Sequence, residues 1–102
     1  MDKHFYGQSK WESKRKAILR RDNYQCRLCR RYGKRTPAKI VHHAIPTEEH
    51  PELRLTDWNL VSLCYSCHEK MHDRDTGLLT EEGENLKRRI LRDARVQGWI
   101  PN

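Results

Sequence analysis

Four cysteines fall into two pairs of equal spacing, Cys26-Arg27-Leu28-Cys29 and Cys64-Tyr65-Ser66-Cys67. A gap of two residues lets both thiolates of a pair bind one ion across a tight turn, and two pairs complete a tetrahedral set. Disulfides would require an oxidising compartment, which nothing in the sequence indicates. A thioredoxin-like redox pair would have a βαβ context and no need of a second pair. We therefore predict one structural Zn²⁺ bound by Cys26, Cys29, Cys64 and Cys67, with no coordination position left open for catalysis.

Two adjacent histidines, His42 and His43, lie in a short segment with β-branched neighbours. Residues 39–45 (Lys-Ile-Val-His-His-Ala-Ile) predict a strand. Because successive side chains of a strand point to opposite faces, the two imidazoles should leave on different sides unless the strand is bent at its end.

Two further histidines, His68 and His72, stand four residues apart after the second cysteine pair. No residue between 66 and 73 breaks a helix, and this spacing predicts both imidazoles on one helical face. His68 directly follows Cys67, so the zinc-binding turn fixes where the helix begins. The four histidines therefore fit a second ion, apart from the cysteine site. The alternative is that some of them support other ligands or lie on the surface.

An amphipathic helix and a second short strand should position these residues. Residues 9–21 lack Gly and Pro and place Trp11 seven positions before Ile18, which predicts a helix with both on one face. The polar pair that follows, residues 22–23, predicts its end. Residues 59–63 (Asn-Leu-Val-Ser-Leu) predict a strand that leads into the second cysteine pair.

A C-terminal helix is predicted from about Thr80 to Gly98. Thr80 can cap its first turn, which is rich in acidic residues that suit the helix dipole. Gly98 can end it. Its apolar stripe, and the segment expected to fold back onto the core behind it, comprise Leu86, Ile90, Ala94, Trp99 and Ile100.

The chain has 102 residues, of which 35% are hydrophobic and 34% charged. This length accommodates one domain, and so few apolar residues make a bound metal a necessary source of stability. No apolar run approaches the roughly 20 residues of a membrane-spanning helix. The first residues also lack the apolar stretch of a signal peptide. We therefore expect no membrane association and a cytoplasmic location.

The 21 Lys and Arg against 14 Asp and Glu give a net charge of +7, which is distributed unevenly. Residues 1–40 hold 13 basic and 3 acidic residues, whereas residues 41–102 hold 8 and 11. A basic first part is typical of a chain that meets phosphates, although a solvated surface is the commoner origin of such a run. The candidate DNA contacts are Lys14, Arg15, Lys16, Arg20, Arg21, Arg27, Arg30, Arg31, Lys34 and Arg35. Four aromatic residues interleaved with them could stack on bases, but we expect most of these to cover the core: Tyr6, Trp11, Tyr24 and Tyr32.

The histidine segments, together with Asn59, resemble the motif of the HNH endonuclease family, in the variant bracketed by two Cys-x-x-Cys pairs. The resemblance covers about residues 11–73 and maps the three motif residues onto His43, Asn59 and His68. It implies an α+β fold with a small zinc-stapled, treble-clef-like ββα-metal core, in which two strands and a helix surround one divalent ion. The expected organisation is one HNH nuclease domain over residues 1–102, with flanking N- and C-terminal helices, the latter at 78–100.

The resemblance also implies catalytic roles for the motif residues. His43 would be the general base that takes a proton from the attacking water, and His42 and His68 would bind the catalytic ion. His72 would be a further ligand or a phosphate contact, with ligand ranked ahead. Asn59 would hold the loop that carries the histidines through its amide. The implied activity is a metal-dependent DNA endonuclease of low sequence specificity that nicks or cuts both strands, leaving 5′-phosphate and 3′-hydroxyl ends.

One position departs from the family pattern. Many members have Asp, a ligand of the ion, where this chain has His42. Imidazole suits Mn²⁺, Co²⁺, Ni²⁺ or Zn²⁺ better than Mg²⁺. We therefore expect a transition metal to support activity at least as well as Mg²⁺.

Residues 20–26 and 50–55 are similar to segments of small free-standing HNH proteins of tailed phages, often encoded beside the packaging terminase. This similarity implies a monomer that acts on DNA in the host cytoplasm, in phage DNA packaging or processing, with a terminase or another packaging protein as a candidate partner. Two alternatives stay open. One is a non-catalytic, zinc-stabilised DNA-binding module, and the other is a terminase accessory subunit that docks through the C-terminal stripe.

Overall fold

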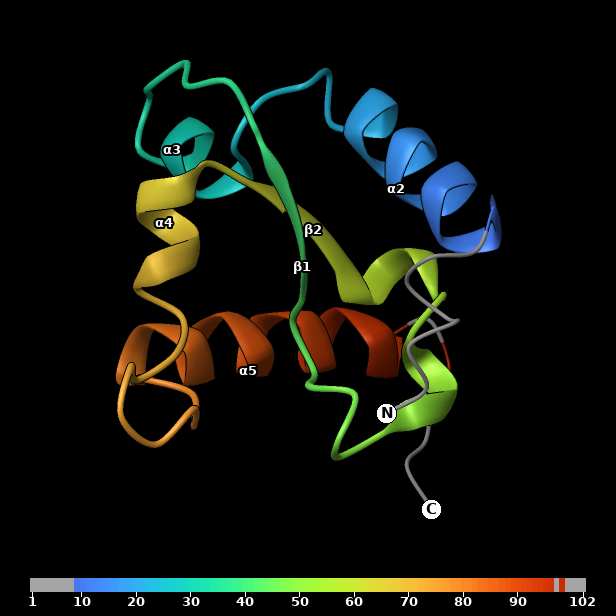
Figure 1. Cartoon of the computed structure of the whole chain (residues 1–102), viewed down its shortest axis with the longest axis vertical. Helices are drawn as coiled ribbons and strands as arrows, with labels where there is room; N and C mark the ends of the chain where they lie inside the picture. The colour runs from blue at the N-terminus through green and yellow to red at the C-terminus, as the bar shows by residue number, and fades with distance from the viewer. Residues whose placement is uncertain (1–8, 97, 99–102) are drawn as a thin grey trace.

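The computed structural model of the chain describes residues 9–96 and 98, which form a small α+β fold around a two-stranded sheet (Figure 1). In chain order the elements are α2 (Ser9–Arg21), α3 (Arg27–Arg31), β1 (Ile40–His43), the 3₁₀ helices η1 (Pro51–Leu53) and η2 (Asp57–Asn59), β2 (Leu60–Leu63), α4 (Tyr65–Glu69) and α5 (Glu81–Val96). No helix of the described part is long and apolar enough to cross a membrane.

The strands β1 and β2 pair antiparallel, with Ile40 opposite Leu63 and His43 opposite Leu60. Because side chains alternate along a strand, the pair presents two faces. One face packs on α2, in a cluster formed by Trp11, Ile18, Leu19, Val41 and Leu60. The predicted sharing of one α2 face by Trp11 and Ile18 is thereby confirmed, since both are buried.

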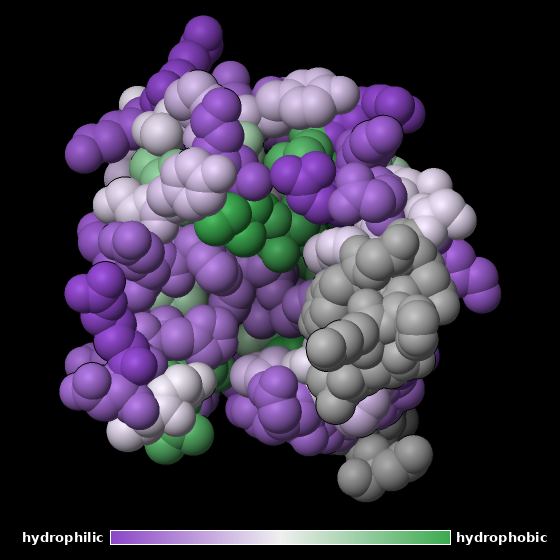
Figure 2. Space-filling view, in the orientation of Figure 1, coloured by the Kyte–Doolittle hydropathy of each residue, from purple (hydrophilic) through white to green (hydrophobic). Residues whose placement is uncertain are grey.

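A second apolar cluster joins the other face of the sheet to both cysteine turns and to α5. It consists of Cys26, Ala44, Val61, Leu63, Cys64, Met71, Leu86 and Ile90. In Figure 1 the sheet accordingly lies between α2 and α5. Both clusters are small, and the surface in Figure 2 is largely hydrophilic, in keeping with a mean hydropathy of −1.06.

The C-terminal helix α5 begins where the sequence predicts it. The Thr80 hydroxyl oxygen accepts a hydrogen bond from the Gly83 backbone N–H at 3.1 Å and so caps the first turn. The described residues of the apolar stripe, Leu86, Ile90 and Ala94, are all buried. They are therefore core residues, and the proposed docking of this stripe on a partner is wrong for them. Three residues of the sequence predictions lie outside the described part of the chain: Tyr6, Trp99 and Ile100.

The helix predicted over residues 66–73 is shorter, because α4 ends at Glu69. The carbonyls of the next two residues are used by the start of α5: Thr80 donates its hydroxyl to the Lys70 carbonyl and its N–H, at 2.9 Å, to the Met71 carbonyl. Met71 itself turns into the core. His72 therefore lies beyond the helix, in an isolated β-bridge with Leu79.

Two other predictions need correction. Both strands are shorter than expected, and Asn59 ends the 3₁₀ helix η2 rather than beginning β2. Two of the three described aromatic residues among the basic residues do not cover the core, since Tyr24 is 56% and Tyr32 is 75% exposed. Only Trp11 of this group is buried.

A buried carboxylate joins the end of α2 to β2. Asp22 accepts hydrogen bonds from the Arg21 guanidinium at 2.8 and 2.9 Å and from the Ser62 backbone N–H at 3.2 Å. Arg21 also donates to the carbonyls of Asp57 and Leu60, at 2.8 and 2.7 Å. Burial alone would raise the pKa of the Asp22 carboxyl, but the hydrogen bonds from Arg21 and Ser62 and the charge of Arg21 lower it overall. Arg21, a predicted DNA contact, therefore has a structural task.

We expect Asp22→Ala to lower the free energy of unfolding by about 3 kcal/mol, because it leaves the Arg21 guanidinium and the Ser62 N–H without their shared acceptor. Arg20→Ala is the matched control, since Arg20 is exposed beside this group and should change stability by no more than about 0.5 kcal/mol. Urea unfolding of the zinc-loaded proteins measures both. Equal stability of the two variants would contradict a joining role for Asp22.

Candidate functional site

The four cysteine sulfurs converge at one point, between α3 and α4. Their Sγ atoms all lie within 4.8 Å of one another, and Cys29 Sγ is 3.9 Å from Cys64 Sγ and 3.7 Å from Cys67 Sγ. Four sulfurs at Zn–S distances of 2.3 Å around a tetrahedral ion would be about 3.8 Å apart. The four residues thus fit a closed zinc site, and they bring together two segments that are distant in the sequence.

Each cysteine pair also shapes the helix that follows its first member. Cys26 Sγ accepts a hydrogen bond from the Cys29 N–H, and Cys64 Sγ accepts one from the Cys67 N–H, both at 3.5 Å. The first cysteine of each pair therefore caps α3 or α4. Burial raises the pKa values of Cys26 and Cys67, so their thiolates require a cation to offset the cost of burying charge.

Three histidines from three places in the sequence form the second cluster. His42 on β1, His68 on α4 and His72 after α4 each offer a ring nitrogen, and these nitrogens lie within 4.8 Å of one another. The ring centroids are 5.4 Å apart for His42 and His68, 5.5 Å for His42 and His72, and 6.2 Å for His68 and His72. Three imidazoles leave coordination positions open for water or substrate, unlike the four cysteines.

His42 carries the clearest sign that this cluster receives a cation. It is 2% exposed, and its Nε2 is the one buried side-chain nitrogen or oxygen without a hydrogen-bond partner among the described residues. Burial, and then the neighbouring imidazoles of His68 and His72, lower the pKa of His42 to about 3. The ring is therefore neutral at physiological pH, with a lone pair available to a metal ion. A metal ion is the partner that would satisfy a buried nitrogen facing two further imidazoles.

His43 is separated from this cluster by the alternation of β1. Its ring stacks on Trp11, with ring centroids 5.3 Å apart and an angle of 17° between the planes. Its Nε2 lies 3.0 Å from the Arg54 carbonyl oxygen, and because a carbonyl can only accept, Nε2 carries the proton. Nδ1 is then the basic nitrogen of the neutral ring. Burial lowers the pKa of His43, while the Arg54 carbonyl and the charge of Glu48 oppose this shift.

Asn59 is fully buried, and both ends of its amide bind the backbone just after the strand that carries the histidines. Its Oδ1 accepts from the Ile45 N–H at 2.7 Å, and its Nδ2 donates to the carbonyls of Ile45 at 3.2 Å and Leu53 at 3.3 Å. This side chain thus joins the end of the β1 segment to η1. It has no exposed surface with which to touch a substrate.

The predicted DNA contacts divide into two groups. Arg21 is bound to Asp22, Lys14 pairs with Asp57, and Arg15 donates to the Lys39 carbonyl at 3.4 Å. The remaining basic residues are exposed on α2 and around α3: Lys16, Arg20, Arg27, Arg30, Arg31, Lys34 and Arg35. This exposed group is the part of the prediction that can reach phosphates directly.

Sequence reasoning missed a glycine that controls where His72 lies. A Cβ at Gly83, in the first turns of α5, would collide with the Met71 carbonyl oxygen and lie 2.9 Å from a Leu79 methyl group. Only glycine therefore lets α5 approach the chain just before His72. A glycine within a predicted helix was the available signal, because such residues often mark a close approach. The stacking of Trp11 on His43 had no comparable signal.

We expect Gly83→Ala to destabilise the protein by about 1–3 kcal/mol and to weaken metal binding at the histidines, because the added methyl displaces Met71 and with it His72. Helix propensity alone would predict the opposite, a gain of about 1 kcal/mol. Val96→Ala, at an exposed position of α5, isolates that propensity effect. Thermal unfolding and calorimetric Mn²⁺ titration check both changes, and a stabilised Gly83→Ala protein with unchanged Mn²⁺ affinity would refute this role.

Comparisons with known proteins agree with this geometry. Residues 26–74, which contain both metal-binding clusters, match the family model of the HNH endonucleases. A search of the curated proteins finds no significant match. Among solved structures, the chain is similar to the crystal structure of the HNH endonuclease of the deep-sea thermophilic bacteriophage GVE2 with a manganese ion, at 34% sequence identity and a TM-score of 0.63. The alignment covers 93% of this chain and 84% of that chain. The chain therefore belongs to the HNH endonuclease family, the metal-dependent DNA nucleases whose active site is built on two strands and a helix.

Proposed function

We propose that this chain hydrolyses DNA phosphodiester bonds at the histidine cluster, with His42, His68 and His72 as ligands of one catalytic divalent ion and His43 as the general base. The observation that carries this assignment is the buried, unpartnered Nε2 of His42 facing two further imidazoles. A non-catalytic DNA-binding module would have no use for this nitrogen, since leaving it unsatisfied costs stability. The cysteine cluster takes no part in the chemistry, because four thiolates fill a zinc coordination sphere.

The chain's own residues divide the work of hydrolysis. The Arg54 carbonyl holds the proton of His43 on Nε2, and Trp11 supports the ring, so that Nδ1 is left to take a proton from water. The water oxygen attacks phosphorus, the bond to the 3′ oxygen breaks, and the products are a 5′-phosphate and a 3′-hydroxyl. When bound, the ion would supply charge stabilisation for the phosphate and the leaving oxygen. Asn59 keeps the segment after His43 in place through Ile45.

Contacts to the DNA come from exposed basic residues around α3 and on α2. Such contacts are made to phosphates, which position the duplex and carry little sequence information. We therefore propose low sequence specificity. A role in phage DNA packaging or processing, acting as a monomer in the host cytoplasm beside a terminase, is supported by the sequence similarity to phage proteins and by the bacteriophage origin of the similar structure.

Replacing His43 by Ala should reduce plasmid cleavage by at least about a hundredfold, because the general base is lost, while DNA affinity and zinc content stay near wild type. His50→Ala is the matched control, since it removes an imidazole bound to Glu52 outside the cluster. Gel analysis of supercoiled plasmid measures cleavage. The assignment of the base fails if His43→Ala nicks as fast as His50→Ala.

The metal preference tests the ligand assignment. We expect Mn²⁺, Co²⁺ or Ni²⁺ to support cleavage at least as well as Mg²⁺, because three imidazoles prefer these ions. His42→Asp should move the preference towards Mg²⁺, since a carboxylate suits that ion. A metal series on wild type and variant, with circular dichroism and zinc content as checks of folding, decides the point. Activity of the wild type with Mg²⁺ alone would contradict it.

A further inference from the structure

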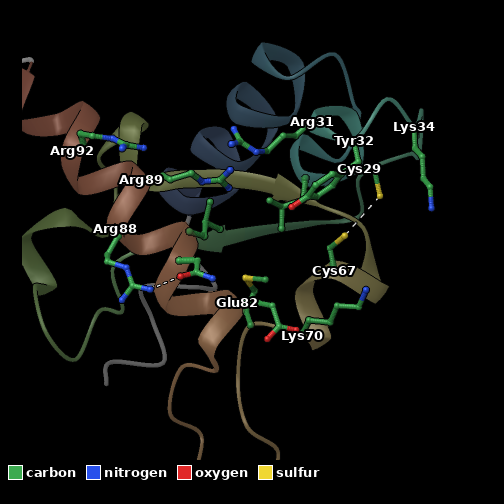
Figure 3. Close-up of a pocket in the computed structure, with 14 residues that line it drawn as sticks. Cys29, Arg31, Tyr32, Lys34, Cys67, Lys70, Glu82, Arg88, Arg89 and Arg92 are labelled. Carbon is green, nitrogen blue, oxygen red and sulfur yellow. Dashed lines mark hydrogen bonds between the residues drawn. The ribbon is translucent and has the colours of Figure 1, made fainter.

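A basic groove lies between α3, α4 and α5, and the catalytic assignment makes no use of it. Its volume is about 740 Å³. Among the residues that line it are Arg31, Lys34, Lys70, Arg88, Arg89 and Arg92, with Glu82 as the single carboxylate. Figure 3 shows Arg92 and Arg89 on α5 facing Arg31 across the groove, with Lys70 on the α4 side.

The cations of the groove gather without carboxylate partners. Within residues 9–96 and 98, none of the six forms a salt bridge, although other basic side chains such as Lys87 do. Partial burial, and then the adjacent guanidinium of Arg31, lower the pKa of Arg89. Like charges held together at the surface raise the free energy of the protein unless an anion binds there.

We propose that this groove binds the phosphate backbone of a nucleic acid strand at a distance from the cleaved bond, with α5 as a phosphate-binding helix. The inference rests on the proposed function, since its ligand is the substrate of the nuclease. The arginines at 88, 89 and 92 span about 6 Å of helix axis, which suits a row of phosphates better than one compact anion. Guanidinium groups bind phosphate oxygens in a bidentate manner.

The position of the groove also favours nucleic acid over an acidic protein segment. Cys67 and Met71 line it, and each directly precedes a histidine of the catalytic cluster, so the two sites lie on adjacent sides of α4. The protein is 35 Å in its longest dimension, about one helical turn of duplex. Tyr32, 75% exposed on the lining, offers a ring on which a base can stack.

Two other origins of this charge make different predictions. The arginines could complement the dipole at the C-terminal end of α5. In that case Arg95, in its last turn and outside the groove, would matter as much as Arg89 or Arg92. Alternatively, they could offset the negative charge of four thiolates on zinc, since Cys29 and Cys67 line the groove. Their loss would then lower zinc retention.

The test measures binding of a fluorescein-labelled 20-bp duplex by anisotropy at 50–200 mM NaCl, in a zinc-loaded His43→Ala background that does not cleave. We expect Arg89→Gln/Arg92→Gln to weaken binding by roughly tenfold or more and to reduce the slope of log K against log [salt] by about 2. The matched control, Arg95→Gln, should bind within twofold of its parent. Zinc content should be the same in all three proteins.

Three results would overturn the inference. One is equal binding by the double variant and Arg95→Gln. Another is loss of zinc in the double variant, which would assign the arginines to the cysteine cluster. The third is selective loss of binding to fluorescein-labelled poly-glutamate with unchanged DNA affinity, which would assign the groove to an acidic protein. Plasmid cleavage by the otherwise unmodified chain is a separate readout, so a failure of the proposed nuclease activity is distinguishable from a failure of the groove.

Discussion

The convergence of four cysteine sulfurs is the constraint on which the rest of the structure depends. The two apolar clusters are small, and the turns at Cys26–Cys29 and Cys64–Cys67 join segments that few other contacts would hold. Because the first cysteine of each pair caps the helix that follows, the same site sets where α3 and α4 begin. His68 lies on α4 immediately after the last of these cysteines. The site that stabilises the fold therefore also positions a ligand of the catalytic cluster.

The two metal-binding clusters differ in what they leave unsatisfied. The cysteine site has a complete tetrahedral set, whereas the histidine site has three ligands and one buried nitrogen, His42 Nε2, that requires a partner. Around it the polar groups are fixed: Asn59 binds Ile45 in both directions, and the Arg54 carbonyl sets the protonated nitrogen of His43. A rigid surround with one open requirement is the arrangement expected of a preorganised metal site.

Much of the fold could be predicted because its causes are local. The apolar spacing in α2 and the Thr80 cap of α5 act within one or two helical turns, and both predictions are confirmed. The predictions that fail depend on partners distant in sequence. The helix containing His68 stops at Glu69 because Thr80 takes the carbonyls that would continue it. Arg21, one of many basic residues in its segment, is distinguished only by the buried Asp22 and the carbonyls of β2 and η2.

The sequence by itself determined the chemistry of this protein. Two Cys-x-x-Cys pairs and a set of histidines specify metal binding, because ligand type and short spacing act without knowledge of the fold. Only the tertiary structure decided how distant residues meet. It brings His72 back to His42 past Gly83, although α4 has ended, and it collects Lys70 and three α5 arginines into a groove. Those four cations belong to residues 41–102, where acidic residues outnumber basic ones. Composition averages charge along the chain, whereas a binding surface depends on which side chains packing places together.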